Sequence, residues 1–227
     1  MGNTVGSYET THWHKRWIPV KKSIHLTSRQ KELILGSLLG DGAMRVGKGS
    51  INANFKVEHG LQQKAYVEWK YSILRPFVFT GPKISYRYGL SKEPYPKSWW
   101  FRTVRHPELS TIYRMFYRGE GYRCGRKITP ASLQKDLTPL VLAVWIMDDG
   151  SYAKGSIELS TYAFTKREIF FLQYCLRKGF SVEASLVSDR DRGYRLYCTR
   201  AGTKRLIEII RVHIIPSMQY KIGLATP

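Results

Sequence analysis

The stretch that decides the fold is TPLVLAVWIMDDG (138–150), an apolar run that closes on two aspartates and a glycine. Thr138 is a good N-cap and Pro139 suits the first helical position, so the run predicts a helix from Thr138 to Asp149. A run with so few polar residues is typical of a helix buried on most sides. A carboxylate at its C-terminal end faces the negative end of the helix dipole, which costs roughly 0.3–1 kcal/mol.

The same pattern stands earlier in the chain, in TSRQKELILGSLLGDG (27–42). Thr27 and Gln30 form a capping box, which satisfies the free N–H groups at the start of a helix. This run ends at Asp41-Gly42, as the other ends at Asp149-Gly150. A single helix ending in Asp-Gly is most simply a turn with a left-handed glycine as its cap. Two such endings at matching points of a repeat favour a functional role for the aspartates.

The segments after each run also correspond. After the first run we expect strands 43–46 and 51–59, helix 61–74, strands 83–89 and 98–104, and helix 107–117. After the second we expect strands 151–153 and 156–162, helix 165–178, strands 181–187 and 194–199, and helix 202–212. The repeat predicts an α+β protein of two pseudo-symmetric αββαββα halves. The expected divisions are an N-terminal extension (1–26), a first half (27–117), a basic linker (118–137) and a second half with a C-terminal tail (138–227).

The charge points to nucleic acid. Lys and Arg number 37 against 17 Asp and Glu, which gives a net charge of +20 and a pI near 10.0. Such an excess is self-repulsive, and a polyanion relieves the repulsion while releasing counterions. The charge alone does not choose between a nuclease, a ribosomal protein and a repressor.

Composition excludes other classes. No apolar run reaches the roughly 18 residues of a membrane span, and the N-terminus lacks the apolar core of a signal peptide. We therefore expect an intracellular protein that does not enter a membrane. Cys124, Cys175 and Cys198 are scattered without a CxxC pair, which favours free thiols over disulfides or a cysteine zinc site.

The repeated aspartates suggest a metal site. If the two apolar helices pack side by side, Asp41 and Asp149 arrive close together. Two neighbouring carboxylates repel each other unless a cation lies between them. Oxygen ligands suit Mg²⁺ or Mn²⁺, and on so basic a protein the chemistry favoured for such a metal is phosphodiester hydrolysis.

ILGSLLGDG (34–42) and LAVWIMDDG (142–150) resemble the two motifs of the LAGLIDADG homing endonuclease family in its single-chain form. STYAFTKREIFFL (160–172) also resembles members, and the similarity runs from Thr27 to Lys221. The resemblance implies motif helices packed at the interface of the halves and antiparallel sheets forming a saddle over DNA. It also implies a site-specific, metal-dependent endonuclease that makes double-strand breaks in a long DNA target. Asp41 and Asp149 are the implied metal ligands, and one chain is expected to act as a monomer.

The second motif departs from the family pattern. The small residues that let motif helices approach are Gly36 and Gly40 in the first copy, where the second has Val144 and Asp148. We therefore expect an asymmetric interface with Asp148 pointing toward the partner helix. Asp148 competes with Asp149 as a metal ligand, and alignment to the closing glycine favours Asp149.

The resemblance further implies a basic residue near the end of each half. IIPSMQYK (214–221) resembles the family pattern that ends in such a lysine, which implies a catalytic role for Lys221. The first-half counterpart is expected within RCGRKITP (123–130), where Lys127 is favoured over Arg126.

DNA contacts are expected from polar residues on the sheet face opposite the helices. These candidates are Arg45, Lys48, Asn52, Asn54, Lys56, Tyr86, Arg87, Tyr88, Lys97 and Arg102 in the first half, and Tyr152, Lys154, Arg190, Arg192, Arg195 and Tyr197 in the second.

Two other functions fit the same fold. The family includes intron RNA-splicing maturases, and a member without cleavage activity would be a DNA-binding protein. Two intact aspartates favour cleavage.

Overall fold

The computed structural model describes residues 18–88, 93–119, 125–189 and 192–225. Most of the expected N-terminal extension and the candidate Arg190 lie outside these residues. Cys175 and Cys198 are free, buried thiols, as expected, and Cys124 is outside the described part.

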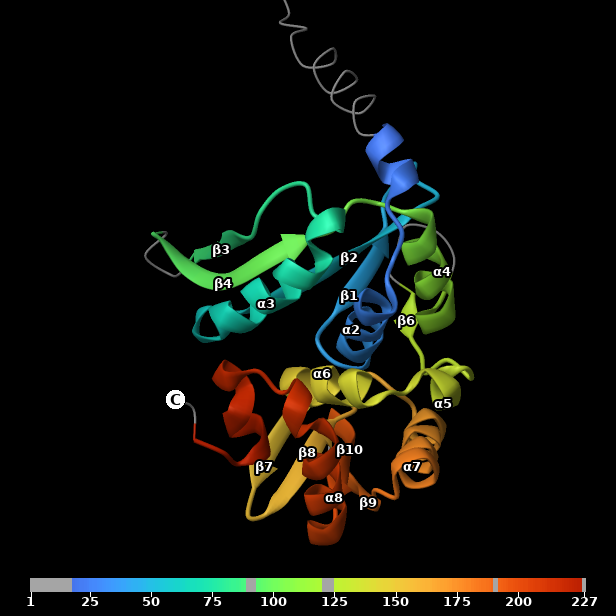
Figure 1. The fold of residues 1–227 in the computed structure, drawn as a ribbon, viewed down its shortest axis with the longest axis vertical. Coiled ribbons are helices and arrows are strands. Elements are labelled where there is room, and N and C mark those ends of the chain that lie inside the picture. Colours follow the sequence, from blue (N-terminus) through green and yellow to red (C-terminus); the bar gives the residue numbers. More distant parts are fainter. Residues whose placement is uncertain (1–17, 89–92, 120–124, 190–191, 226–227) are drawn as a thin grey trace, which may run out of the picture.

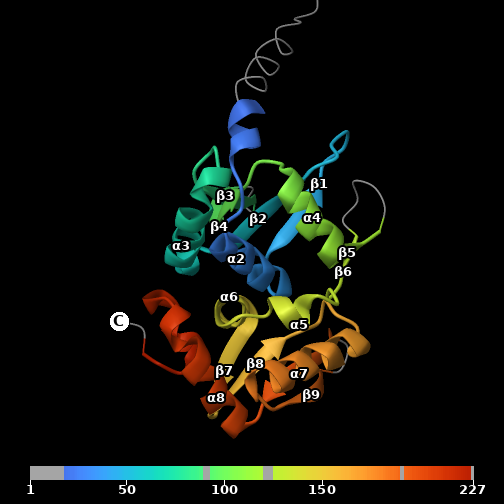
Figure 2. The ribbon, with the colours of Figure 1, turned by 45° about the vertical axis from the view of Figure 1, so that its right-hand side comes forward.

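The predicted order of elements is confirmed in both halves (Figures 1 and 2). The first half contains α2 (Ser28–Leu39), β1 (Ala43–Val46), β2 (Ala53–Gly60), α3 (Lys64–Leu74), β3 (Lys83–Tyr88), β4 (Pro94–Arg102) and α4 (Pro107–Phe116). The second contains α6 (Pro139–Asp149), β7 (Gly150–Ala153), β8 (Ser156–Ser160), α7 (Lys166–Phe180), β9 (Ala184–Asp189), β10 (Gly193–Cys198) and α8 (Arg200–Ile210). The chain is thus an α+β protein built from a repeated unit.

The two four-stranded sheets have the same topology. Their strand orders are β1-β2-β4-β3 and β7-β8-β10-β9, with every pair of neighbours antiparallel. Helices cover one face of each sheet, so that face is apolar and its residues alternate with outward ones. In β2, for example, Phe55 and Val57 are buried while Asn54 and Lys56 between them are partly exposed.

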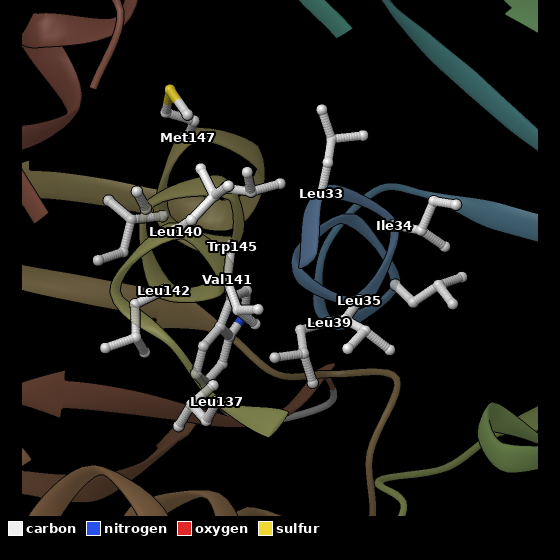
Figure 3. Packing of buried hydrophobic residues seen from close by; sticks show 14 of the residues in the cluster. Leu33, Ile34, Leu35, Leu39, Leu137, Leu140, Val141, Leu142, Trp145 and Met147 are labelled. Atoms are coloured by element: carbon white, nitrogen blue, oxygen red, sulfur yellow. The ribbon is translucent and has the colours of Figure 1, made fainter. Parts of the chain in front are cut away.

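The two motif helices, α2 and α6, lie side by side at the centre of the molecule (Figures 1 and 3). A Cβ added to Gly36 of α2 would lie 2.6 Å from the Val141 carbonyl oxygen and 2.7 Å from Val144 Cβ. The helices are therefore close enough to require glycine on one side, which is the asymmetry expected from the sequence. Figure 3 shows Ile34 pointing away from α6 and Leu142 pointing away from α2, so each helix also serves the core of its own half.

The segment between the halves carries regular structure. β5 (Tyr117–Arg118) pairs with β6 (Arg126–Lys127), and a short helix α5 (Leu133–Asp136) precedes α6. Near the end of the chain, the 3-10 helices η4 (Arg211–His213) and η5 (Pro216–Ile222) bring the chain back to β7. β6 and η5 thus lie beside the C-terminal ends of the motif helices, where each contributes a lysine to the site described below.

Strand β4 begins at Pro94, four residues before the expected start at Ser98. Proline normally ends a strand because it donates no hydrogen bond. Here β2 pairs with β4 only at Ser98–Arg102, so Pro94 and Pro96 need no partner on that side and pair only with β3. The expected helix end at Asp41 was also wrong, since α2 ends at Leu39.

None of the helices within the described ranges is long and apolar enough to cross a membrane.

Candidate functional site

The two Asp-Gly endings are not left-handed glycine caps. Gly150 has φ −76°, and Gly42 is absent from the glycines with positive φ. A Cβ on Gly42 would lie 2.7 Å from the Ser37 carbonyl oxygen, and one on Gly150 would lie 2.6 Å from the Ile146 carbonyl oxygen. Glycine is required because the chain folds tightly against the last turn of each motif helix. The preceding aspartates are therefore held at the junction of helix and first strand in each half.

Asp41 and Asp149 share one electrostatic environment. Burial raises the pKa of Asp149 to about 7, and repulsion from Asp41 adds to the rise. Burial also raises the pKa of Asp41, with repulsion from Asp148 as the next cause. Lys127 and Lys221 oppose both rises. The site thus concentrates negative charge that a cation would stabilise.

Lys127 and Lys221 make equivalent contacts in the two halves. The Lys127 ammonium on β6 donates to the carbonyls of Gly40 and Gly42, at 2.8 and 3.0 Å, on either side of Asp41. The Lys221 ammonium on η5 donates to the carbonyls of Asp148 and Gly150, at 3.3 and 2.8 Å, on either side of Asp149. Burial lowers the pKa of both lysines, while the nearby aspartates favour the charged form.

Arg126 lies elsewhere. Its guanidinium donates to both carboxylate oxygens of Glu168 at 2.7 and 3.2 Å, and its side chain is half-exposed. Glu168 belongs to the capping box of α7, so this pair joins the β5–β6 connection to the second half. Of the two candidates left open by the sequence, Lys127 is therefore the one beside the motif.

Asp148 points toward the partner helix, as expected. A Cβ on Gly40 would lie 2.4 Å from Asp148 Cβ, so only glycine fits opposite it. The Asp148 side chain is fully buried and its Oδ1 accepts from the Lys70 ammonium at 2.6 Å and the Tyr66 hydroxyl at 2.7 Å. These contacts hold Asp148 inside the protein and leave Asp149 as the carboxylate of α6 that can serve as a ligand.

Sequence reasoning missed three residues next to the site, His59, Tyr66 and Lys70. One signal was available, because Tyr66, Lys70 and Leu74 are spaced four apart on α3 and all are buried. A lysine on a buried helix face must have a partner, since an unpaired buried charge is very costly. His59 Nδ1 lies 3.6 Å from Asp41 Oδ2, and its Nε2 lies 3.4 Å from Lys70 Nζ. Burial, reinforced by Lys70, lowers the pKa of His59 to about 4.

The donor set fits Mg²⁺ or Mn²⁺. Within the described ranges, no group of three or more His, Cys, Asp and Glu residues is arranged to hold a metal. The chain thus offers two carboxylates and neighbouring carbonyls instead of a closed cage. Mg²⁺ is commonly bound in this way, through one or two carboxylates completed by water and substrate phosphates.

Several predicted DNA-binding residues share the open face of the first sheet. The register pairs Arg45 with Asn54 and Lys56 with Arg102, which puts all four on one side. Arg87 is exposed on β3, beyond a register shift between Ser85 and Tyr86. Lys97 borders the hollow that also contains Asp41, Arg45 and Lys56. Lys48 is exposed in the turn between β1 and β2.

In the second sheet, Arg195 and Tyr197 share the open face with Glu158, to which Arg195 donates at 2.7 Å. Lys154 is in the turn between β7 and β8, with φ 52°. Arg192 is exposed next to β10.

Asn52 and Tyr152 lie away from these open faces. The Asn52 side-chain oxygen Oδ1 accepts from the Ser110 hydroxyl at 3.1 Å, so the side chain turns toward α4. Tyr152 pairs with the buried Ile157 and packs against Gly223, where an added Cβ would lie 2.4 Å from its ring. Tyr86 and Tyr88, both exposed, alternate with Arg87 along β3, so the two tyrosines point to the face opposite that of Arg87. Three consecutive strand residues cannot all face DNA, which the sequence-based list overlooked.

A family model described as the LAGLIDADG DNA endonuclease family matches residues 31–206. DNA endonuclease I-ChuI of Chlamydomonas applanata is 28% identical over 209 residues, which cover 87% of this chain and 96% of that protein. Cytochrome b mRNA maturase bI2 of Saccharomyces cerevisiae is 27% identical over 84% of this chain, and the match spans only 46% of the maturase.

The fold is also found in a solved structure. The homing endonuclease I-WcaI bound to its DNA recognition sequence superposes with a TM-score of 0.79 at 23% identity, covering 99% of this chain and 96% of that one. The family match includes most of α2, all of α6, both sheets and the junctions that hold Asp41 and Asp149. The chain therefore belongs to the LAGLIDADG DNA endonuclease family.

Proposed function

We propose that this protein is a site-specific homing endonuclease that makes metal-dependent double-strand breaks in a long DNA target. The observation that carries the proposal is the repeated arrangement at the motif ends. In each half, one half-buried lysine donates to the two carbonyls that flank the motif aspartate. Two equivalent centres in one chain suit the cleavage of two strands, and they need no second copy of the protein.

Each residue of the centre has a separate task. Asp41 and Asp149, ionised, would hold Mg²⁺ or Mn²⁺, which supplies activation of water and neutralisation of the leaving oxygen. Lys127 and Lys221 fix the backbone around each aspartate and put positive charge beside the phosphates to be cut. Burial of the carboxylates, together with their mutual repulsion, is the reason that the site gains from a cation.

The open faces of the two sheets would bind the DNA target. The net charge of +20 gives a strong, sequence-independent attraction for the DNA backbone. Arg45, Asn54, Lys56 and Arg102 on one sheet, and Arg195 on the other, are of the types that read guanine and adenine edges in the major groove.

Selection of cleaved sites from a randomised duplex library, with Mg²⁺ or Mn²⁺, tests the proposal. We expect one family of related long sites, cut on both strands. Asp41→Asn and Asp149→Asn should abolish double-strand cutting while tight binding to the selected site remains. The proposal fails if the wild-type protein cuts no member of the library, or if cutting survives in chelator.

RNA splicing is a second candidate, supported by the similarity to the maturase over most of this chain. The distinguishing measurement is splicing of a host intron in vitro with the wild-type protein and with Asp41→Asn/Asp149→Asn. Splicing that the double substitution leaves intact would establish an RNA function separate from cleavage.

A further inference from the structure

A buried cluster connects the first half to the second motif helix. It contains His59 of β2, Tyr66 and Lys70 of α3, and Asp148 of α6, all of them buried. Lys70 Nζ donates to Asp148 Oδ1 at 2.6 Å, and the Tyr66 hydroxyl donates to the same atom at 2.7 Å. The cluster has no counterpart by symmetry, because the position equivalent to Asp148 is Gly40.

The donors of Lys70 determine the tautomer of His59. Lys70 Nζ lies 3.4 Å from His59 Nε2, and an ammonium group has only donors. Asp148 Oδ1 also lies near His59 Nε2, at 3.7 Å, but the Lys70 ammonium is closer and donates, so Nε2 accepts and the ring proton is on Nδ1. That nitrogen faces Asp41 Oδ2 at 3.6 Å. The Nδ1–H is thus directed at the carboxylate of the first motif.

We propose that His59 is a positioning residue for Asp41, held in its Nδ1–H tautomer by the buried Lys70–Asp148 pair. The inference rests on the proposed function, in which Asp41 is a metal ligand. The Nδ1–Oδ2 separation is longer than a hydrogen bond, and catalytic contacts of this kind tighten when substrate and metal bind. The N–H orients one oxygen of Asp41 and leaves the other free. Because Asp148 belongs to α6, the second motif helix controls the ligand of the first.

The tautomer is measurable without DNA or metal. Long-range ¹H–¹⁵N correlation spectra distinguish Nδ1–H from Nε2–H histidines, and the His59 signals are identified by their loss in His59→Asn. We expect the Nδ1–H form in the wild-type protein. Lys70→Met/Asp148→Asn removes the donor and the buried charge together, so it avoids an unpaired buried carboxylate. In this variant His59 should leave the Nδ1–H form for Nε2–H.

Two substitutions separate the contact of the ring with Asp41 from its contact with Lys70. The Asn amide nitrogen takes the place of Nδ1 and keeps a donor toward Asp41. The Gln amide oxygen takes the place of Nε2, so it accepts from Lys70 and leaves Asp41 without the donor. Outer-shell partners of metal ligands are typically worth about 10–100-fold in metal affinity or activity. His59→Gln should lose that much in cleavage and in Mn²⁺ affinity of the DNA complex, whereas His59→Asn should lose only a few-fold.

Thermal unfolding and DNA affinity, measured on both variants, separate positioning from folding. A merely structural role predicts equal losses for Asn and Gln that follow the change in stability. That result, or an Nε2–H tautomer in the wild-type protein, would overturn the proposal. Failure of the proposed function would instead appear as a wild-type protein that cuts no DNA, with the His59 tautomer unaffected.

Discussion

At the residue scale, the site consists of carboxylates brought together against their own repulsion. Asp41 and Asp149 could be predicted from the sequence because each ends a copy of a repeated motif. The role of Asp148 could not, because its partners Lys70 and Tyr66 come from the other half of the chain. No local sequence pattern predicts a contact between residues that are 78 and 82 positions apart. The spacing on α3 shows only that Lys70 needs some buried partner.

The pKa of Asp149 predicts a pH dependence of stability in the metal-free protein. Folding raises this pKa from the ordinary 3.8 to about 7, so the folded state binds the proton more tightly than the unfolded state. The resulting stability is fully present below the unfolded pKa and is lost as pH rises through about 7. In the presence of chelator the melting temperature should therefore fall as pH rises from about 6 to about 7 and level off above that.

His59 contributes with the opposite sign at lower pH. The folded pKa of His59, about 4, lies below the ordinary 6.5. The stability that neutral His59 contributes to the folded protein is therefore lost as pH falls from 6.5 to about 4. Because His59 is present in both proteins, the difference in melting temperature between the wild type and Asp149→Asn gives the contribution of Asp149 alone. The substitution should flatten the fall above pH 6, whereas Glu208→Gln on the exposed side of α8 should not. A wild-type curve that rises over this range would contradict the raised pKa.

The same carboxylate predicts how metal affinity changes with pH. Asp149 must lose its proton before it binds a cation, so affinity for Mn²⁺ should rise with pH until it levels off above about 7. Titration of the protein with Mn²⁺, followed by electron paramagnetic resonance of the free ion, measures this directly. Affinity that does not change from pH 5 to 8 would show that Asp149 is no ligand.

At the element scale, two glycines of α2 decide how closely the motif helices approach. The sequence predicts this close packing through Gly36 and Gly40, and the structure adds the facing atoms in Val144 and Asp148. Element boundaries were harder to predict. Strand β4 includes Pro94 and Pro96 only because β2 does not reach them, and that is a property of the neighbouring strand. The inward turns of Asn52 and Tyr152 likewise depend on α4 and on the segment after η5.

Gly40→Ala tests the approach of the helices. Its Cβ would lie 2.4 Å from Asp148 Cβ, next to the rigid contacts with Lys70 and Tyr66. Overpacking of this kind costs about 1–3 kcal/mol of unfolding free energy, measured by urea denaturation. The matched control is Gly179→Ala in α7, where no atom lies within 4 Å of the new Cβ. That change should stabilise the protein by about 0.5–1 kcal/mol. Equal effects at both positions would mean that the α2–α6 contact is looser than described.

At the scale of the whole molecule, the excess positive charge and the open sheet faces have to act together. The charge was evident from composition, and the two-half architecture from the repeat. Which basic residues share an open sheet face was only partly predictable, because strand alternation requires a known register. Arg45 and Arg177 provide a direct comparison. Arg45 is exposed on the open face at β1, and Arg177 is exposed on α7, which packs on the other face of the second sheet.

Arg45→Ala should weaken binding to the selected DNA site and reduce the slope of log K against log salt by about one, if the residue contacts a phosphate. If it reads a base, the loss should be about 1–3 kcal/mol and confined to one position of the target. Arg177→Ala removes the same charge and should leave affinity, slope and specificity as in the wild type. Affinity measured from 50 to 200 mM salt separates these outcomes, since about 6–10 phosphate contacts give a fall of roughly 10³–10⁵ over that range. Equal effects of the two substitutions would mean that net charge drives binding and that the sheet faces carry no part of the recognition.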